Sequence, residues 1–193
     1  MVVPPTPLPV RTKAGLRAAI RAARRAFVAG LAPGERARLE QALAARLRLF
    51  GGQPTASYAA MGAEIDPFAA DNLAVPLLFP RVGNDRLTFH AAPRLALVPG
   101  FGGIAEPAAT APAKVPRIVL VPLVACDVAG NRIGQGAGHY DRSLAALRAA
   151  GAVTAIGLAW EVQIVAAIPA DPWDEPLDWV ATPARLVDCR ASR

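Results

Sequence analysis

The segment of this chain with the clearest chemistry is a short loop of three alternating glycines. Gly134, Gly136 and Gly138 follow an apolar run from Arg117 to Cys126 and precede a segment of helical composition that begins near Tyr140. Because glycine lacks a Cβ, such a loop can turn several backbone N–H groups toward one anion, and the start of the next helix adds a positive dipole. The order strand, glycine loop, helix start predicts a phosphate-binding site.

Two arginines stand on either side of this loop. Arg132 precedes the glycines and Arg142 follows them, with Tyr140 and Asp141 in between. A guanidinium makes paired hydrogen bonds to phosphate oxygens, so the combination suits a polyphosphate better than a single carboxylate. A merely flexible turn would not explain why these polar residues crowd around the glycines.

Two familiar phosphate loops do not fit the segment. A Walker loop needs Gly-Lys-Ser/Thr, and neither of the two lysines, Lys13 and Lys114, follows a glycine. A dinucleotide-binding fingerprint needs a glycine or alanine at the sixth place from Gly134, where His139 stands. The loop therefore belongs to another class of phosphate site.

Length and composition predict one domain. The 193 residues suffice for one well-buried core and are few for two, and with 53% hydrophobic but only 6% aromatic residues the core is expected to consist of small aliphatic side chains. We expect a tail over residues 1–11, a single α/β domain over residues 12–187, and a second tail over residues 188–193.

The cysteines and the N-terminus favour a cytoplasmic protein. Cys126 and Cys189 lie in different contexts and show no metal-ligand spacing, so neither a disulfide framework nor a zinc site is expected. The first residues contain four prolines and no basic residue, unlike a signal peptide. No stretch approaches the roughly 18 apolar residues that a membrane span needs.

The net charge of +6 admits two kinds of partner, nucleic acid or a small polyanion such as a nucleotide or a polyglutamylated cofactor. Composition alone does not choose between them. Aromatic residues are few and are not interleaved with the basic ones, which weakens the case for a surface that stacks single-stranded bases. Nucleic acid remains the minor alternative.

An N-terminal pair of helices is predicted. Between Thr12, a suitable N-cap, and Gly30, apolar residues recur at helical spacing, and a second helix is expected from about Gly34 to Phe50. The expected buried positions are Leu16, Ile20, Ala23 and Phe27 in the first helix and Leu39, Leu43, Leu47 and Phe50 in the second.

A basic stripe runs along the first helix. Lys13, Arg17, Arg21 and Arg24 follow one another at steps of four, four and three, which places them on one face. We expect Lys13 and Arg17, at the helix start, to meet a phosphate, and Arg21 and Arg24 to be a solvated face.

The rest of the chain alternates between strand-like and helix-like segments. This pattern predicts an α/β layered fold with a largely parallel central sheet flanked by helices. Residues 93–116 are rich in Gly and Pro and are expected to form a long irregular connection beside a site. The expected strands are Thr55 to Met61, Leu77 to Val82, Leu87 to Ala92, Arg117 to Cys126, Val153 to Ala159 and Leu177 to Ala181, and the expected helices are Pro67 to Leu73, Tyr140 to Ala150 and Glu161 to Ile168.

Motifs in this order resemble the 5-formyltetrahydrofolate cyclo-ligase (methenyltetrahydrofolate synthetase) family over roughly residues 12 to 182. Agreement at many places in order is more specific than one glycine motif. The segments that carry the resemblance are Lys13-Ala-Gly-Leu-Arg17, Tyr58, Glu64-Ile-Asp66, Leu78-Phe-Pro-Arg81, Leu87-Thr-Phe89, Gly103-Ile-Ala-Glu-Pro107, Val121-Pro122, Asp127, Gly130, Arg132-Ile-Gly-Gln-Gly-Ala-Gly-His-Tyr-Asp-Arg142, Ile156-Gly-Leu158, Gln163, Pro169, Asp174 and 178–182.

Three residues depart from the family's usual pattern. Pro67 stands where a Thr is usual, Cys126 where a Phe is usual, and His139 where the first residue of a Tyr-Tyr pair is usual. None of these changes removes a charged group that phosphate chemistry needs. They bear on how the substrate ring is held.

The resemblance implies an enzyme that uses ATP and Mg²⁺ to cyclise 5-formyltetrahydrofolate to 5,10-methenyltetrahydrofolate, releasing ADP and phosphate. It implies catalytic roles for Lys13 and Arg132, and metal ligation by Asp141 and Asp174, whose carboxylates suit a hard cation. The implied ATP-binding residues are Lys13, Arg17, Arg132, Ile133, Gly134, Gln135, Gly136, Ala137, Gly138, His139 and Tyr140, and the implied substrate-binding residues are Tyr58, Glu64, Gly136 and Tyr140.

Two other functions remain open from the sequence. One is a fold relative without catalysis that binds RNA through its basic face, although the intact glycine loop and Glu64 argue against it. The other is a kinase-like or transferase activity on a different heterocycle. We expect a monomer without membrane association whose folate substrate carries one or several glutamates.

Overall fold

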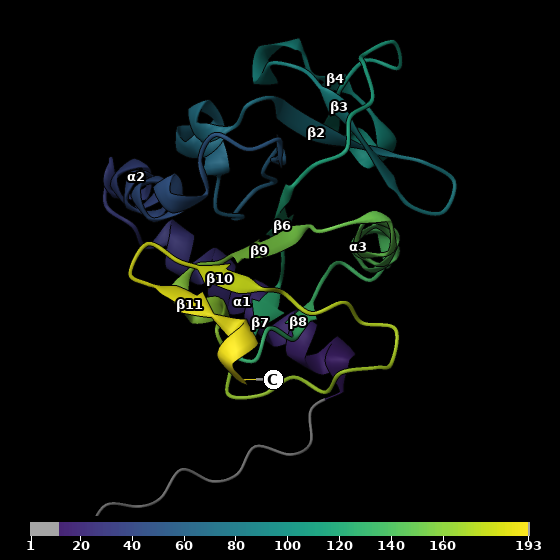
Figure 1. The fold of residues 1–193 in the computed structure, drawn as a ribbon. Helices are drawn as coiled ribbons and strands as arrows, with labels where there is room; N and C mark the ends of the chain where they lie inside the picture. Colours follow the sequence, from purple (N-terminus) through teal and green to yellow (C-terminus); the bar gives the residue numbers. More distant parts are fainter. Residues whose placement is uncertain (1–11, 193) are drawn as a thin grey trace, which may run out of the picture.

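The computed structural model describes residues 12–192 and shows a layered α/β fold (Figure 1). None of the helices within that range is both long and apolar enough to span a bilayer. The α-helices are α1 (Lys13–Ala29), α2 (Glu35–Leu47) and α3 (His139–Ala150), and the short 3₁₀ helices are η1 (Arg48–Phe50), η2 (Pro67–Leu73), η3 (Arg94–Ala96), η4 (Phe101–Gly103), η5 (Glu161–Gln163) and η6 (Cys189–Ser192).

A seven-stranded sheet in the order β11-β10-β9-β6-β1-β2-β3 forms the central layer. The five inner strands are parallel, and only the edge strands β11 and β3 are antiparallel to their neighbours. Two small ladders pair β4 with β5 and β7 with β8. The strands are β1 (Thr55–Ala56), β2 (Leu77–Val82), β3 (Leu87–Ala91), β4 (Val98–Pro99), β5 (Ala105–Glu106), β6 (Ile118–Pro122), β7 (Ala125–Cys126), β8 (Arg132–Ile133), β9 (Thr154–Leu158), β10 (Trp179–Ala181) and β11 (Leu186–Asp188).

Strand β6 shows why the sheet is covered on both faces. Its side chains alternate, so Val119 and Val121 enter the core that contains Leu144 of α3, whereas Ile118 and Leu120 enter the core that contains residues of α2. Figure 1 shows α3 and α2 on opposite sides of the strands. The result is three layers, with α3 on one face of the sheet and α2 and the end of α1 on the other.

The connections place a crevice at the carboxyl ends of β1 and β6. These two strands are parallel neighbours, but from β1 the chain continues to β2 on one side, whereas from β6 it leads to β9 and β10 on the other. Ligands of open α/β sheets bind outside the carboxyl ends of strands at such a reversal. The segments that follow β1 and β6 are therefore where a site is expected.

The expected α/β fold with a largely parallel sheet is confirmed, and several element boundaries are wrong. The strand expected over Thr55 to Met61 ends at Ala56. Ser57 N–H still donates to the Leu78 carbonyl of β2 at 2.8 Å, but the Tyr58 carbonyl accepts from the Arg94 side chain at 3.2 Å. The apolar run from Arg117 to Cys126 is divided into β6 and β7 at Pro122, which cannot donate a ladder hydrogen bond.

The helix expected from Glu161 to Ile168 is also wrong, since only the single turn η5 forms. Ile164 instead makes a parallel bridge with Cys126, and Val165 N–H donates to the Cys126 carbonyl at 2.9 Å. Backbone pairing with a distant segment therefore outweighs local helical preference. The long connection over residues 93–116 contains the β4–β5 ladder, and strands β8 and β11 were not expected.

Of the two predicted tails, only the C-terminal one falls, up to residue 192, within the described residues. The N-terminal one, residues 1–11, lies outside the described residues. At the C-terminal end, Asp188 closes β11, and Cys189 is fully buried with its N–H donating to the Asp178 carbonyl at 3.0 Å. Residues 188 and 189 are therefore packed against the sheet, and the predicted boundary at residue 187 lies too early.

Gly157 in the middle of β9 provides a test of the core packing. A Cβ at this position would lie 2.4 Å from Leu177 Cδ1 and 2.8 Å from Leu123 Cδ2. We expect Gly157→Ala to lower the free energy of unfolding by about 1–3 kcal/mol, the usual cost of overpacking a core, as measured by urea denaturation.

Gly30, at the C-terminal end of α1, supplies the matched control. Its φ of −85° suits any residue and a Cβ there would meet its neighbours at ordinary contact distances of 3.4 Å or more. Gly30→Ala should change stability by less than about 1 kcal/mol. Equal effects of the two substitutions would contradict the packing described for β9.

Candidate active site

The glycine loop follows β8 and leads directly into α3. Gly136 has φ of +111° and Gly138 has φ of +69°, and Gly138 is also the N-cap of α3. Only glycine adopts such angles without strain, so the predicted conformational role is confirmed for these two residues but not for Gly134, whose φ is not positive. The loop residues Gln135 to Ala137 are exposed. An anion can reach both the loop and the positive end of α3.

The basic stripe of α1 lies along this loop. Arg17 Nε donates to the Gly134 carbonyl at 2.9 Å, and Arg21 Nη2 donates to the Gln135 side-chain oxygen. A Cβ on Gly136 would lie 3.9 Å from Arg17 Nη2, so this guanidinium borders the loop at two residues. The helix thus brings cations from one end of the chain to a loop more than a hundred residues away.

Lys13, at the start of α1, contacts two carboxylates. Its Nζ lies 2.6 Å from both Asp171 Oδ2 and Asp174 Oδ2. Burial tends to lower the pKa of Lys13, but its hydrogen bonds to Asp171 and Asp174 outweigh this and raise it. Burial likewise tends to raise the pKa of Asp174, but the hydrogen bonds from Asp171 N–H and Lys13 and the charge of Arg132 lower it. Both groups are therefore held in their charged forms.

Arg132 contacts Asp141, one of the two acidic residues that were predicted to bind metal, and the backbone next to the other. Its Nη2 lies 2.6 Å from Asp141 Oδ1, and its Nη1 donates to the Glu175 carbonyl, one residue after Asp174. Asp141 Oδ1 also accepts from Glu175 N–H at 3.2 Å. Burial lowers the pKa of Arg132, against the opposing charges of Asp141 and Asp174, yet an arginine keeps its charge.

Glu64 occupies the segment that follows β1. The residue is 7% exposed, and its two carboxylate oxygens accept from Met61 N–H and from Gln135 Nε2, each at 3.1 Å. The surrounding backbone is fixed by Arg36, which donates to the Glu64 carbonyl at 2.8 Å, and by Trp160, which donates to Ala63 at 3.0 Å. The bond between Glu64 and Gln135 links the predicted substrate carboxylate directly to the predicted phosphate loop.

The predicted tyrosines and His139 lie around the same region with different exposure. Tyr58 is buried, its hydroxyl donates to the Ile65 carbonyl at 2.7 Å, and burial raises its pKa well above the usual value. Tyr140 packs against the core and burial raises its pKa also. His139 contacts Phe101 of η4 edge-on, with ring centroids 6.3 Å apart. Tyr58 therefore supports the segment of Glu64, and His139 borders the loop.

The expected exposure of Arg24 is wrong. The sequence placed it on a solvated face and placed Ala23 in the core, whereas Ala23 is exposed and Arg24 is only 7% exposed. Its Nη1 lies 3.8 Å from Glu64 Oε1 and donates to the Leu123 carbonyl at 3.2 Å. The signal was present in the spacing, because Arg24 follows Ile20 by four residues and precedes Phe27 by three.

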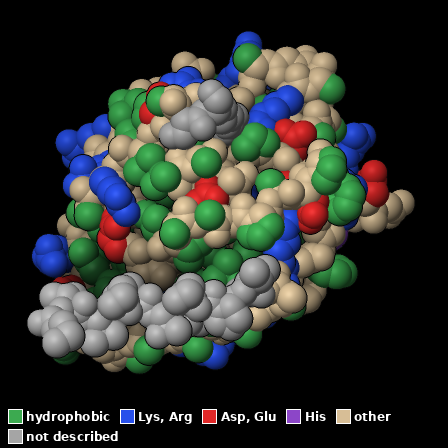
Figure 2. Space-filling view, turned by 90° about the horizontal axis from the view of Figure 1, so that it is seen from below, with side chains coloured by type: hydrophobic (Ala, Val, Ile, Leu, Met, Phe, Trp, Pro, Cys, Tyr) green, Lys and Arg blue, Asp and Glu red, His purple; other side chains and the backbone are tan. Residues whose placement is uncertain are grey.

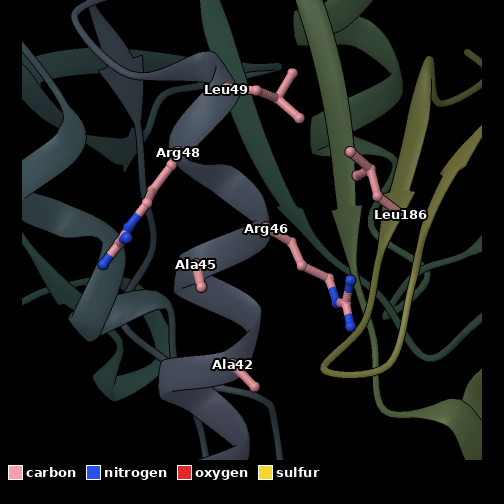
Figure 3. A pocket seen from close by; sticks show the side chains of 6 residues that line it. All are labelled: Ala42, Ala45, Arg46, Arg48, Leu49 and Leu186. Carbon is pink, nitrogen blue, oxygen red and sulfur yellow. The ribbon is translucent and has the colours of Figure 1, made fainter.

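Other surface features lie apart from this site. A hollow of about 610 Å³ lies between α2 and β11 and is shown in Figure 3; none of its lining residues belongs to the predicted site. On the face seen in Figure 2, basic side chains lie among hydrophobic and acidic ones and do not form one basic patch within the described part of that face. The residues that line the hollow are Ala42, Ala45, Arg46, Arg48, Leu49 and Leu186.

Together, the parallel sheet, the glycine loop ahead of α3 and the nearby cations define an α/β protein with an arrangement typical of phosphate-binding sites, next to a buried carboxylate. A match to one protein family narrows this class further. The chain belongs to the 5-formyltetrahydrofolate cyclo-ligase family, whose model matches residues 9–183, so the resemblance found in the sequence is confirmed.

Individual relatives agree with this assignment. The 5-formyltetrahydrofolate cyclo-ligase of Escherichia coli K12 is 31% identical over 122 residues, 61% of this chain and 66% of that protein. That of Haemophilus influenzae is 34% identical over 110 residues, 55% of this chain and 58% of that protein. These matches span slightly under two thirds of the relatives' lengths. The NMR structure of Aquifex aeolicus 5,10-methenyltetrahydrofolate synthetase has a TM-score of 0.75 and 26% identity, covering 94% of each chain.

The Lys13–Asp174 contact predicts an acid-sensitive contribution to stability. Because the folded-state pKa of Asp174 lies below its usual value of 3.8, its contribution is present above that value and is lost as the pH falls through the folded pKa. We expect the free energy of unfolding to decline more steeply between pH 5 and pH 3 in the wild type than in Asp174→Asn, by at most about 1.4 kcal/mol per pH unit.

The measurement is a series of urea denaturation curves over this pH range. Asp85→Asn, in the exposed turn between β2 and β3, serves as the control and should keep the wild-type slope. Parallel curves for the wild type and Asp174→Asn would show that the contact with Lys13 adds nothing to the folded state.

Proposed function

We propose that the protein catalyses the ATP-dependent cyclisation of 5-formyltetrahydrofolate to 5,10-methenyltetrahydrofolate, with release of ADP and phosphate. One observation carries the proposal most directly. The basic face of α1 runs from Lys13 beside two carboxylates, past the glycine loop, to the buried Glu64, so phosphate-binding and ring-binding chemistry lie along one helix. Membership in the family supplies the reaction.

The reaction requires the protein to align a phosphoryl group rather than to provide a nucleophile. The formyl oxygen of the substrate attacks the γ-phosphorus of ATP, and the bond to the departing ADP breaks. N10 of the substrate then attacks the activated carbon and gives up its proton, which the departing phosphate or solvent can take, and the C–O bond breaks to release phosphate. Positioning and neutralisation of charge are the main protein contributions to such a transfer.

The cations of the site are suited to that task. Lys13 and Arg17 lie at the start of α1, Arg132 of β8 bonds to Asp141 of α3, and the loop, exposed from Gln135 to Ala137, offers backbone N–H groups. Lys13 now contacts Asp171 and Asp174, and we propose that its Nζ turns to the transferred phosphoryl group when ATP binds. Arg132, held by Asp141, would face the same charge from a fixed position.

Asp141 and Asp174 are the residues that we propose hold Mg²⁺. No group of three or more potential ligands is clustered within the described residues, but Mg²⁺ typically takes only one or two carboxylates and completes its shell with phosphate oxygens and water. Asp141, paired with Arg132 at the start of α3, and Asp174, paired with Lys13, supply two carboxylates, which fits that donor set. When bound, the ion would neutralise charge on the phosphates.

Glu64 is the group that we propose binds the ring of the folate. A buried carboxylate accepts hydrogen bonds from the N–H groups along the edge of a pterin. Gln135 now donates to Glu64 from the exposed loop, so a substrate donor can take its place. Tyr140, Gly136 and Tyr58 complete the proposed substrate side. A monomeric state, a polyglutamylated substrate and a cytoplasmic location remain predictions.

The activity is tested by following the near-ultraviolet absorbance of methenyltetrahydrofolate after mixing the protein with 5-formyltetrahydrofolate and Mg-ATP. We expect ATP-dependent product formation by the wild type, and a decrease of about 10²-fold or more in kcat for Lys13→Ala and Arg132→Ala, because each removes a charge that faces the transferred phosphoryl group.

Lys114→Ala is the matched control, since Lys114 is the only other lysine and its side chain is exposed on the connection before β6. It should retain wild-type kcat, and circular dichroism shows whether each variant is folded. No product from folded wild type that binds ATP would point to another heterocyclic substrate, whereas salt-sensitive binding of RNA without nucleotide would favour the non-catalytic alternative.

The metal assignment is tested through the magnesium dependence of the same assay. We expect Asp141→Asn to raise the Mg²⁺ concentration for half-maximal rate by about tenfold or more, because an amide replaces a charged ligand. Asp85→Asn controls for the loss of one negative charge elsewhere. An unchanged magnesium requirement in a folded Asp141→Asn protein would remove Asp141 from the metal site.

A further inference from the structure

Arg24 is a buried cation that the proposed chemistry does not use. It is 7% exposed, and its Nε is the one buried side-chain nitrogen or oxygen without a hydrogen-bond partner among the described residues. Burial lowers its pKa, with the charge of Glu64 acting in the opposite direction. Desolvating a guanidinium is costly, and an apolar side chain at this position would avoid that cost. A purely structural role therefore gives a poor account of the residue.

The guanidinium of Arg24 contacts a carboxylate and a backbone carbonyl. Its Nη1 lies 3.8 Å from Glu64 Oε1 and 3.2 Å from the carbonyl of Leu123, just beyond the end of β6. That carbonyl also accepts from Gln163 Nε2 at 2.9 Å, so the place of the guanidinium is fixed from two sides. Glu64, in turn, is 7% exposed and would be an uncompensated buried charge without its cation.

Two further partners of the Glu64 carboxylate come from different segments, one local and one distant in sequence. Met61 N–H is part of the same turn, and Gln135 belongs to the exposed glycine loop. If a ring donor displaces Gln135, the charge of Glu64 remains balanced only by Arg24. The guanidinium can thus keep one carboxylate oxygen charged and directed toward the ring while the loop moves.

We propose that Arg24 is a positioning residue for the substrate ring. It holds the Glu64 carboxylate ionised and directed toward the glycine loop, and it thereby sets the affinity for the donor edge of the folate and not the affinity for ATP. This inference rests on the proposed function. The two ends of the stripe are well separated, because eleven residues of α-helix between Lys13 and Arg24 correspond to about 16 Å.

The experiment compares Arg24→Met, which keeps an unbranched apolar stem and removes the charge, with Arg24→Lys, which keeps the charge. Arg25→Met is the matched control, because Arg25 is the next residue of the same helix and is exposed. For each folded variant, KM is measured separately for 5-formyltetrahydrofolate and for ATP, and binding of 5-formyltetrahydrofolate without ATP is measured by titration calorimetry.

We expect Arg24→Met to raise KM and Kd for 5-formyltetrahydrofolate by about tenfold or more, because the buried Glu64 carboxylate loses its paired cation, and to leave KM for ATP within about twofold. Arg24→Lys should recover part of the affinity, and Arg25→Met should match the wild type. In a Glu64→Gln protein, Arg24→Met should add less than about twofold. A parallel rise in both KM values, or an equal effect in the Glu64→Gln background, would overturn the proposal.

The assay of the wild type alone decides whether the proposed function fails. That outcome is therefore distinguishable from a failure of the proposal for Arg24. If the wild type forms no methenyltetrahydrofolate, the interaction between Arg24 and Glu64 is still testable. Urea denaturation gives the free energy of unfolding of Arg24→Met, Glu64→Gln and the double variant. The double variant should then be more stable than the sum of the single effects predicts, because no unpaired charge is left buried. Additive effects would show that Arg24 does not position Glu64.

Discussion

The site depends on charges that α1 brings to partners far along the chain. Lys13 meets Asp174, Arg17 meets the backbone of the glycine loop, and Arg24 meets Glu64. Each contact pairs a cation with an oxygen, which offsets part of the cost of removing these charged groups from water. An exposed row of the same residues would be screened by water and salt and would do little to stabilise one loop conformation. Partial burial of these paired cations therefore helps to fix the geometry of the site.

The parallel sheet determines where that helix is useful. Since β1 and β6 are neighbours whose connections diverge, the segments after their carboxyl ends lie beside one crevice, and these segments carry Glu64 and the peptide carbonyl of Leu123. Arg24 contacts both. The helix thus bridges the two halves of the sheet at the reversal of strand order, which is where α/β proteins usually bind ligands. The fold supplies the crevice and α1 supplies its charge.

Much of this arrangement was predictable from the sequence, because its signals are local. Apolar alternation and glycine spacing predicted the layered α/β fold and the loop at Gly136 and Gly138. The errors arose where distant contacts decide. Ile164 pairs with Cys126 instead of continuing a helix, Asp188 ends a strand that only β10 can complete, and Arg24 is buried because Glu64 lies opposite. Periodicity predicts which face of a helix or strand a residue lies on, but not which distant residues it contacts there.

The bond between Gln135 and Glu64 suggests how the two substrates influence one another. Gln135 of the glycine loop donates to the carboxylate that we assign to the ring, so the two proposed binding regions share one hydrogen bond. A ring donor that takes this bond frees the Gln135 amide, and Arg21 on α1 then remains its partner. The loop would stay attached to α1 while its contact with Glu64 is lost. Binding of the ring thereby changes the restraint on the phosphate loop, which is the physical basis for coupling between two sites.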